Sequence, residues 1–215
     1  MRIAVLGGSF NPIHVGHLVL ADEVCSVLGY DRVLFVPAFV PPHKELNGGY
    51  SAKDRLEMTR LACADDERFE AESCEIDRGG VSYTYDTICY LEEKYSGQLE
   101  GKIGLIMGHD LLPGFHLWHR AKELSEKCEL ILALRPEGHV DSEKSNKPKE
   151  GYAELDADFD ISREELFKNA VSLKNPLLDI SSTEIRTRIS EGRTIRYLVP
   201  SSVFKYIRNM VEDNK

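Results

Sequence analysis

Short apolar runs alternate with helical patterns along most of the chain, and this alternation is the feature that most constrains the fold. The runs have the length and the β-branched content of buried strands. The four clearest are residues 2–6 (RIAVL), 32–36 (RVLFV), 102–107 (KIGLIM) and 129–134 (ELILAL). Strands that are separated by helices at this spacing form βαβ units with right-handed crossovers. The sequence therefore predicts an α/β fold with a parallel sheet.

Helical patterns lie between these runs and after the last of them. Apolar side chains recur at helical spacing over residues 18–28, and Ser51 is placed to cap a helix over residues 52–64. Further helices are expected at residues 84–95, 117–127, 162–170, 181–189 and 202–210, and weaker strands at residues 69–76 and 177–180. The whole pattern predicts a Rossmann-like, doubly wound sheet with helices on both faces and a small C-terminal helical part.

The chain is long enough for one domain with a real core. Its 215 residues are 42% hydrophobic, which is typical of a globular protein. Residues 136–158 are charged, rich in Ser, Pro and Gly, and without periodicity, so we expect a mobile surface excursion there. We expect a single domain over residues 1–215, in which residues 181–215 form the C-terminal helical part.

Composition excludes several classes of function. The net charge of −9 makes the chain a poor non-specific nucleic-acid binder. Its five cysteines are scattered and form no C-x-x-C pair, which argues against a disulfide framework and a structural zinc site. No apolar run approaches the roughly 18 residues of a membrane span, and the first run is too short for a signal peptide. We expect a cytoplasmic protein without membrane or nucleic-acid partners.

The stretch GGSFNPIHVGH, residues 7–17, follows the first strand, and parallel sheets bind ligands at the carboxyl ends of their strands. Gly7 and Gly8 let a ligand approach the backbone closely. His14 and His17 stand three residues apart at the start of a helix, so both imidazoles can face one side of its first turn. A helix N-terminus beside two imidazoles predicts a site that binds phosphate oxygens.

This stretch also has other interpretations. The simplest is a tight turn whose histidines cap the helix or pack in the core. A zinc site would need a third ligand, and no Cys, His or Asp nearby supplies it. The phosphate-binding patterns G-x-x-x-x-G-K-[ST] and G-x-G-x-x-G are both absent. We therefore expect no metal held by protein side chains.

The same stretch resembles the H-x-G-H signature of the nucleotidyltransferase superfamily, and a second motif strengthens the resemblance. Small adenylyltransferases of that superfamily carry I-S-S-T-x-x-R near the C-terminus, and this chain has ISSTEIR at residues 180–186. Ser181 and Glu184 form the S-x-x-E pattern of a capping box, which explains the serines without a ligand but leaves Arg186 unexplained. The two interpretations are compatible, because a capped helix N-terminus can also hold phosphates.

The resemblance implies which residues contact ATP. Ser182, Thr183 and Arg186 would hold its β- and γ-phosphates at the second helix N-terminus. The complete expected set is Gly7, Gly8, Ser9, Phe10, His14, Gly16, His17, Arg135, Ser181, Ser182, Thr183 and Arg186.

Four further stretches resemble bacterial nicotinate mononucleotide adenylyltransferases. They are VPAFVPPHK (residues 36–44), SYTYDT (82–87), GHDLLPGFHLW (108–118) and RTIRYLVPSSVFKYI (193–207). The resemblance implies that the chain joins ATP to nicotinate mononucleotide, giving nicotinate adenine dinucleotide and pyrophosphate, a step of NAD biosynthesis. The residues expected to hold the mononucleotide are Lys44, Thr84, Asp110, Trp118 and His119.

These residues also have simpler roles. Lys44 follows two prolines that stiffen its loop, so it could grip a phosphate or lie in solvent. Trp118 could stack on the pyridine ring or pack in the core. Thr84 could bind the nicotinate carboxylate or cap its helix, and Asp110 could bind a ribose hydroxyl or cap a helix. The chain departs from the family pattern at His109, where a small residue is frequent.

The implied chemistry is direct in-line attack of the mononucleotide phosphate on the α-phosphorus of ATP. No general base is required, because the attacking phosphate is already an anion. His14, His17, Lys44 and Arg186 would act as catalytic cations or donors, with Mg²⁺ carried on the phosphates. The alternatives are a sister adenylyltransferase that uses nicotinamide mononucleotide or phosphopantetheine, and a non-catalytic nucleotide-binding module. A homo-oligomer is compatible with the sequence.

Overall fold

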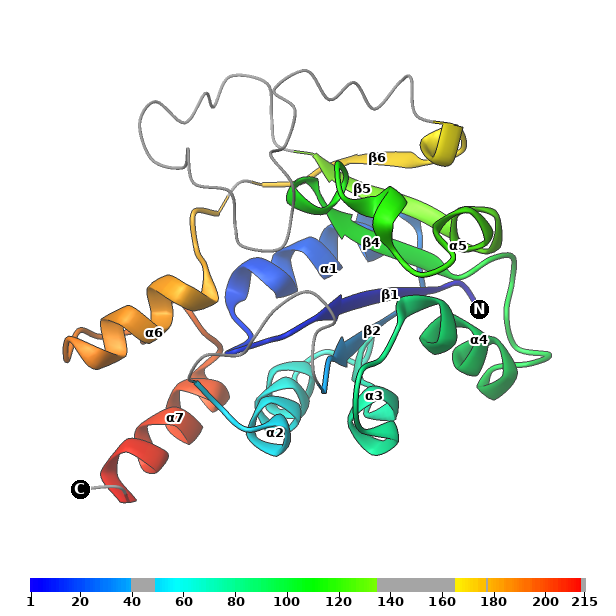
Figure 1. The fold of residues 1–215 in the computed structure, drawn as a ribbon. Helices are drawn as coiled ribbons and strands as arrows, with labels where there is room; N and C mark the ends of the chain where they lie inside the picture. The colour runs from blue at the N-terminus through cyan, green and yellow to red at the C-terminus, as the bar shows by residue number, and fades with distance from the viewer. Residues whose placement is uncertain (40–48, 135–164, 177, 214–215) are drawn as a thin grey trace.

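Six parallel strands form one sheet in the order β3-β2-β1-β4-β5-β6 in a computed structural model that describes residues 1–39, 49–134, 165–176 and 178–213 (Figure 1). The strands are β1 Ile3–Gly8, β2 Arg32–Pro37, β3 Phe69–Ala71, β4 Gly104–Gly108, β5 Glu129–Leu134 and β6 Val171–Lys174. Every neighbouring pair is parallel. The predicted α/β class and parallel sheet are confirmed.

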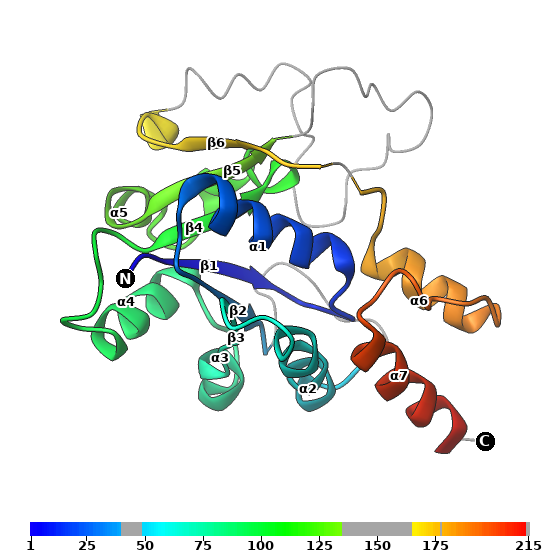
Figure 2. The same ribbon diagram turned by 180° about the vertical axis from the view of Figure 1, so that it is seen from behind.

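Helices cover both faces of this sheet, as expected of a doubly wound fold. They are α1 Val15–Leu28, α2 Ala52–Cys63, α3 Cys74–Arg78, α4 Thr84–Lys94, α5 Ala121–Lys127, α6 Ser182–Ser190 and α7 Ser201–Asp213, with short 3-10 turns η1 His109–Leu111, η2 Phe115–Leu117 and η4 Glu165–Phe167. Figure 1 shows α3 and α4 in front of the sheet, and Figure 2, from behind, shows α1 in front of it.

Alternation along the strands builds one core on each face. Ala4 and Leu6 of β1 pack with buried side chains of α1, α2, α6 and α7. Ile3 and Val5, which point the other way, pack with buried side chains of α3, α4 and α5. Because both sides of each central strand are covered, its sequence is a continuous apolar run.

The order of the strands places the ligand-binding edge. The sheet grows from β1 in one direction through β2 and β3 and in the other through β4, β5 and β6. The loops after β1 and β4 therefore diverge at the carboxyl edge, where doubly wound folds bind ligands. Helices α6 and α7 lie together beyond the carboxyl end of β1 in both views, which confirms a C-terminal helical part (Figures 1 and 2).

The structure differs from the predicted elements in three regions of the chain. The strand expected at residues 69–76 ends at Ala71, because Glu72 Oε1 accepts the Cys74 amide at 3.0 Å and helix α3 starts there. The helix expected at residues 117–127 starts only at Ala121, because Arg120 has a left-handed backbone (φ 56°).

The third correction is at the last strand. A helix was expected over residues 162–170 and a strand over residues 177–180, whereas the described part has a 3-10 turn at Glu165–Phe167 and the strand β6 at Val171–Lys174. Leu173 of β6 is only 1% exposed, so its burial beside β5 outweighs the weak local pattern. The excursion expected at residues 136–158 lies outside the described residues.

Two further findings concern the helices and the cysteines. None of the described helices is both long enough and apolar enough to pass through a bilayer. All five cysteines are free thiols, and four of them are buried. These four pack in the two cores, at Cys25, Cys63, Cys74 and Cys128.

Candidate active site

The loop after β1 is anchored by an aromatic side chain. Phe10 is 1% exposed, and its ring packs against the rings of His17 and Phe35, with centroids 5.0 and 5.9 Å away. A Cβ on Gly8 would lie 3.0 Å from the Phe10 ring, so glycine is needed there. Since the Phe10 ring is in the core, only its backbone faces the place where ATP was predicted to bind. A Cβ on Gly7, by contrast, would meet no atom within 4 Å.

The two histidines of the first motif form one stacked unit at the start of α1. Their ring centroids are 3.7 Å apart. His14 is the N-cap residue of α1, and its backbone N–H donates to His17 Nδ1 at 3.2 Å. Because Nδ1 accepts, a neutral His17 carries its proton on Nε2, which is then a donor. A Cβ on Gly16 would lie 3.1 Å from His14 Nδ1, so this glycine makes room for the stack.

Burial keeps both imidazoles neutral in the free protein. Desolvation lowers the pKa of His14 to about 4. Desolvation and the neighbouring His14 hold the pKa of His17 well below its usual value. A neutral imidazole can still donate one hydrogen bond through its protonated nitrogen. His14 Nδ1 is buried without a hydrogen-bond partner, so one polar atom of the pair is unsatisfied.

The second motif caps its own helix, as predicted. Ser181 is the N-cap of α6, and its hydroxyl oxygen accepts the Glu184 amide at 3.1 Å. The expected capping box is only half formed, because the Glu184 carboxylate pairs with Arg188 at 2.8 Å instead of reaching back. The cap therefore leaves the other side chains of the motif available for other contacts.

Those other side chains join the second motif to the first. Ser182 Oγ donates to the carbonyl oxygen of Pro12 at 2.9 Å, and Arg186 Nη1 donates to the carbonyl oxygen of Asn11 at 2.8 Å. Arg186 Nη2 also lies 3.3 Å from Thr183 Oγ1. The two motifs, far apart in the sequence, thus form one continuous site in which two helix N-termini share a loop.

Two further contacts fix this loop. Asn11 Oδ1 accepts the Tyr50 backbone N–H at 2.9 Å, so the amide at this position acts as an acceptor. The Val15 N–H at the start of α1 donates to the carbonyl oxygen of Leu198 at 3.0 Å. Leu198 belongs to the C-terminal stretch 193–207, which is therefore part of the architecture of the site.

Three of the residues predicted to hold the mononucleotide, Thr84, Trp118 and His119, lie at the start of α4 and in the turn before α5. Thr84 is the first residue of α4, and Tyr83, not Thr84, is its N-cap. The His119 ring lies over the Tyr83 ring, with centroids 4.5 Å apart. Trp118 is half-buried against Phe115, and its Nε1 is buried without a partner. The start of α4 and the turn before α5 thus form one aromatic cluster.

Asp110 lies in the turn that follows β4. It is exposed, and β4 is the strand beside β1 at the point where the strand order reverses. A Cβ on Gly108 would lie 2.8 Å from Asp110 Oδ1, so glycine permits the carboxylate to fold back on the strand end. Asp110 therefore lies at the carboxyl end of β4, and its predicted contact with a ribose hydroxyl stays a prediction.

Backbone strain occurs both in the first motif and in the aromatic cluster. Phe10 (φ 44°) and Arg120 (φ 56°) are the two non-glycine residues with positive φ in the described part of the chain. Each stands beside a predicted ligand residue, Phe10 in the first motif and Arg120 directly after His119. Strained conformations of this kind concentrate at functional sites, which supports this edge as the active site.

Two predicted residues cannot be placed and one was missed. Lys44 and Arg135 lie outside the described residues. Arg55 of α2 was missed, although it is fully buried and its guanidinium donates to the carbonyl oxygen of Ser9 in the first motif at 2.6 Å. A signal was present in the sequence: Arg55 has the same helical phase as the buried Met58 and Ala62, so it is a charge within an apolar stripe.

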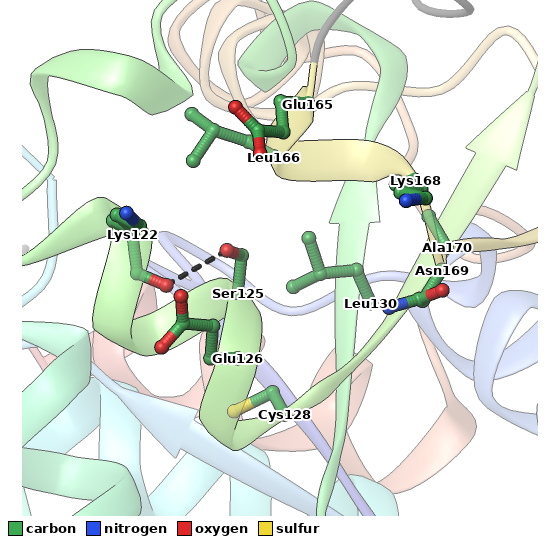
Figure 3. A pocket seen from close by; sticks show the side chains of 10 residues that line it. All are labelled: Lys122, Ser125, Glu126, Cys128, Leu130, Glu165, Leu166, Lys168, Asn169 and Ala170. Carbon is green, nitrogen blue, oxygen red and sulfur yellow. Dashed lines mark hydrogen bonds between the residues drawn. The ribbon is translucent and has the colours of Figure 1, made fainter.

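A separate hollow of about 290 Å³ lies at the opposite edge of the sheet (Figure 3). Leu130 and Ala170, at the starts of β5 and β6, line it with residues of α5. Its Ser125 hydroxyl already donates to the Lys122 carbonyl at 2.8 Å. This hollow contains none of the motif residues, so we do not assign the active site to it.

Comparisons with known proteins identify the family of the chain. Residues 5–188 match the family model described as cytidylyltransferase-like. The probable nicotinate-nucleotide adenylyltransferase of Treponema pallidum is 42% identical over 207 residues, 96% of each chain. That of a Synechococcus strain is 41% identical, over 96% of this chain and 94% of its own.

Solved structures give the same fold. Plasmodium falciparum nicotinic acid mononucleotide adenylyltransferase complexed with NaAD has a TM-score of 0.67 at 18% identity, and the match covers 97% of this chain and 95% of that chain. A putative nicotinate-nucleotide adenylyltransferase from Vibrio parahaemolyticus has a TM-score of 0.62. The chain belongs to the cytidylyltransferase-like family and, within it, to the nicotinate-nucleotide adenylyltransferases.

Proposed function

We propose that this enzyme transfers the adenylyl group of ATP to nicotinate mononucleotide, releasing pyrophosphate and forming nicotinate adenine dinucleotide for NAD biosynthesis. The observation that carries the proposal is the junction of the two motifs. The bonds of Ser182 to Pro12 (2.9 Å) and of Arg186 to Asn11 (2.8 Å) bring two helix N-termini and the histidine pair to one loop. Such an arrangement suits a chain of phosphates.

ATP binds with its phosphates at this loop. The Nε2–H of His17 donates to a phosphate oxygen near the reacting phosphorus, and Arg186 and the α6 N-terminus bind the pyrophosphate end. These donors stabilise the charge that moves onto the leaving oxygens in the transition state. Neutral donors suffice for His14 and His17, whose pKa values burial lowers.

The mononucleotide binds at the aromatic cluster. Trp118 stacks on the pyridine ring, while Thr84 and the backbone near His119 bind the nicotinate carboxylate. Asp110 binds a ribose hydroxyl. The mononucleotide phosphate is then directed across the β1–β4 crevice at the α-phosphorus of ATP, and its attack forms the new P–O bond as pyrophosphate departs.

ATP enters this reaction as its Mg²⁺ complex, so the metal is part of the substrate. The described residues contain no group of three His, Cys, Asp or Glu side chains that could hold a metal ion. The imidazoles at the first motif are also nitrogen ligands, which Mg²⁺ disfavours. Mg²⁺ on the phosphates reduces their repulsion of the incoming mononucleotide.

The direct test is pyrophosphate release by the purified protein with Mg-ATP. Nicotinate mononucleotide, nicotinamide mononucleotide and phosphopantetheine are offered in separate reactions. We expect a strong preference for nicotinate mononucleotide, because a site built to pair with a carboxylate rejects an amide. Preference for another acceptor would show that the enzyme uses that compound as its substrate instead of nicotinate mononucleotide. ATP binding without any turnover would favour a non-catalytic module.

A further inference from the structure

Arg55 is the one arginine with a fully buried side chain among the described residues. It lies in the first turn of α2, and its guanidinium reaches two different loops. Nη1 donates to the carbonyl oxygen of Ser9 at 2.6 Å, and Nη2 donates to the carbonyl oxygen of Phe39 at 3.0 Å. A single planar group thus joins two segments that are separate in the chain.

Each of these loops serves one substrate in the proposed reaction. Ser9 belongs to the first motif, where ATP is proposed to bind, and Phe39 belongs to the stretch 36–44, of which Lys44 was predicted to hold the mononucleotide. The loops leave neighbouring strands side by side, since Gly8 pairs with Pro37 and the Ala38 N–H donates to the carbonyl oxygen of Gly8 at 2.9 Å. The guanidinium fixes their separation just beyond the sheet.

The charge of Arg55 is not explained by a salt bridge. Within the described ranges no carboxylate pairs with it, and its Nε is buried without a partner. Burying a guanidinium without a counter-ion is costly, and a neutral amide could tie the same two carbonyl groups. The guanidinium is instead satisfied by two backbone carbonyl oxygens, one from each of the two segments.

We infer that Arg55 is a positioning residue for the proposed adenylyl transfer: it holds the backbone at Ser9 and at Phe39, directly after β1 and β2, in the relative placement that aligns the two substrates. The inference rests on the proposed function. It has a specific kinetic consequence. Without the Arg55 guanidinium each substrate still binds, but the attacking phosphate and the α-phosphorus are misaligned. We therefore expect kcat to fall more than either KM rises.

The test compares Arg55→Lys with the wild-type enzyme. Lysine keeps the charge and cannot donate to both carbonyl groups in one plane. We expect kcat to fall roughly 10- to 100-fold, while the KM values for ATP and for the mononucleotide each change less than about threefold. Arg55→Met, which removes the donors altogether, should lose at least as much kcat.

Thr59→Val is the matched control. Thr59 lies one turn further along α2, is equally buried, and its hydroxyl donates to the Arg55 carbonyl oxygen at 2.7 Å without touching either loop. Its kcat should stay within about twofold of wild type, even where its melting temperature falls, because no loop contact is lost. Circular dichroism gives the folded fraction of every variant, and kcat is expressed per folded molecule.

The outcomes separate the two proposals. Wild-type protein without turnover would overturn the proposed function and this inference with it. An active wild type with a folded Arg55→Lys variant of equal kcat would overturn the inference alone. So would a loss of activity that disappears when kcat is corrected for the folded fraction, because Arg55 would then act only on stability.

Discussion

The hydroxyl of Ser182 donates to the carbonyl oxygen of Pro12 at 2.9 Å, and this bond joins the start of α6 to the loop before α1. Both elements present a helix N-terminus to that loop, with His14 at the start of one and Ser181 at the start of the other. Neither helix end alone is a specific site. Together they present two sets of donors to one loop, which is the arrangement that the proposed triphosphate site requires.

Replacing Arg186 by Met should weaken the ATP side of the reaction. The variant loses its donor to Asn11 and the positive charge proposed to bind pyrophosphate, and charged hydrogen bonds of this kind contribute about 1.5–3 kcal/mol. We expect kcat/KM for ATP to fall by roughly 10- to 100-fold in steady-state assays of pyrophosphate release. The KM for the mononucleotide should change little.

Arg188→Met is the control for that variant. Arg188 is on the same helix and pairs with Glu184 at 2.8 Å, on the surface and away from the loop. An exposed pair of this type contributes little, so kcat/KM should stay within about twofold of wild type. If both arginine variants lost activity equally, Arg186 would have no specific role.

His17→Asn should remove a transition-state donor while keeping the local backbone intact. The Asn side-chain oxygen can accept the His14 N–H in place of His17 Nδ1, but nothing replaces the Nε2–H donor. Loss of one such donor costs on the order of 3 kcal/mol, so kcat should fall about 100-fold. His17→Gln, which places an amide N–H near the former Nε2, should recover part of the loss. An unchanged kcat in His17→Asn would remove His17 from the mechanism.

The sequence predicted the parts of this site that depend on strong local signals. Long apolar runs located β1, β2, β4 and β5, and two motifs located the loop at Ser9–His14 and the start of α6. What it could not predict depends on tertiary contacts. The start of α3 depends on the Glu72 carboxylate meeting the Cys74 amide, and β6 depends on burial beside β5.

Arg55 shows the same limit at the site itself. Its guanidinium contacts loops that lie 46 and 16 residues earlier in the chain. Local periodicity showed only that a charge stood within an apolar stripe of α2. The neutral state of His14 and His17 is equally a result of the packing around them, because desolvation is what lowers their pKa.

The buried His14 predicts that the fold loses stability in mild acid. Its pKa is about 4 in the folded protein and near 6.5 when unfolded, so below pH 6.5 the unfolded state binds more protons. The stabilisation by the neutral imidazole is complete above pH 6.5 and is lost as the pH falls to 4. The free energy of unfolding should drop by up to about 1.4 kcal/mol per pH unit from this group.

His14→Asn provides the comparison. Asparagine is a good N-cap and does not titrate, so urea unfolding between pH 7 and pH 4.5 should give a shallower pH dependence than wild type. His116→Asn, which replaces an exposed imidazole in η2, is the control for the loss of a histidine side chain. Parallel curves for wild type and His14→Asn would show that His14 is not the source of the acid sensitivity.

Trp118→Phe should weaken the mononucleotide side alone. Trp118 is the single tryptophan, half-buried against Phe115 at a centroid distance of 5.3 Å, and phenylalanine keeps that packing but offers less area to a pyridine ring. Aromatic pairs contribute about 0.5–1.5 kcal/mol, so the KM for nicotinate mononucleotide should rise about 3- to 10-fold while the KM for ATP is unchanged. In the wild-type enzyme, titration with the mononucleotide should quench the tryptophan fluorescence.

His116→Ala, an exposed change two residues away, should alter neither KM. A Trp118→Phe variant with wild-type KM, together with fluorescence that the mononucleotide does not affect, would place the pyridine ring elsewhere.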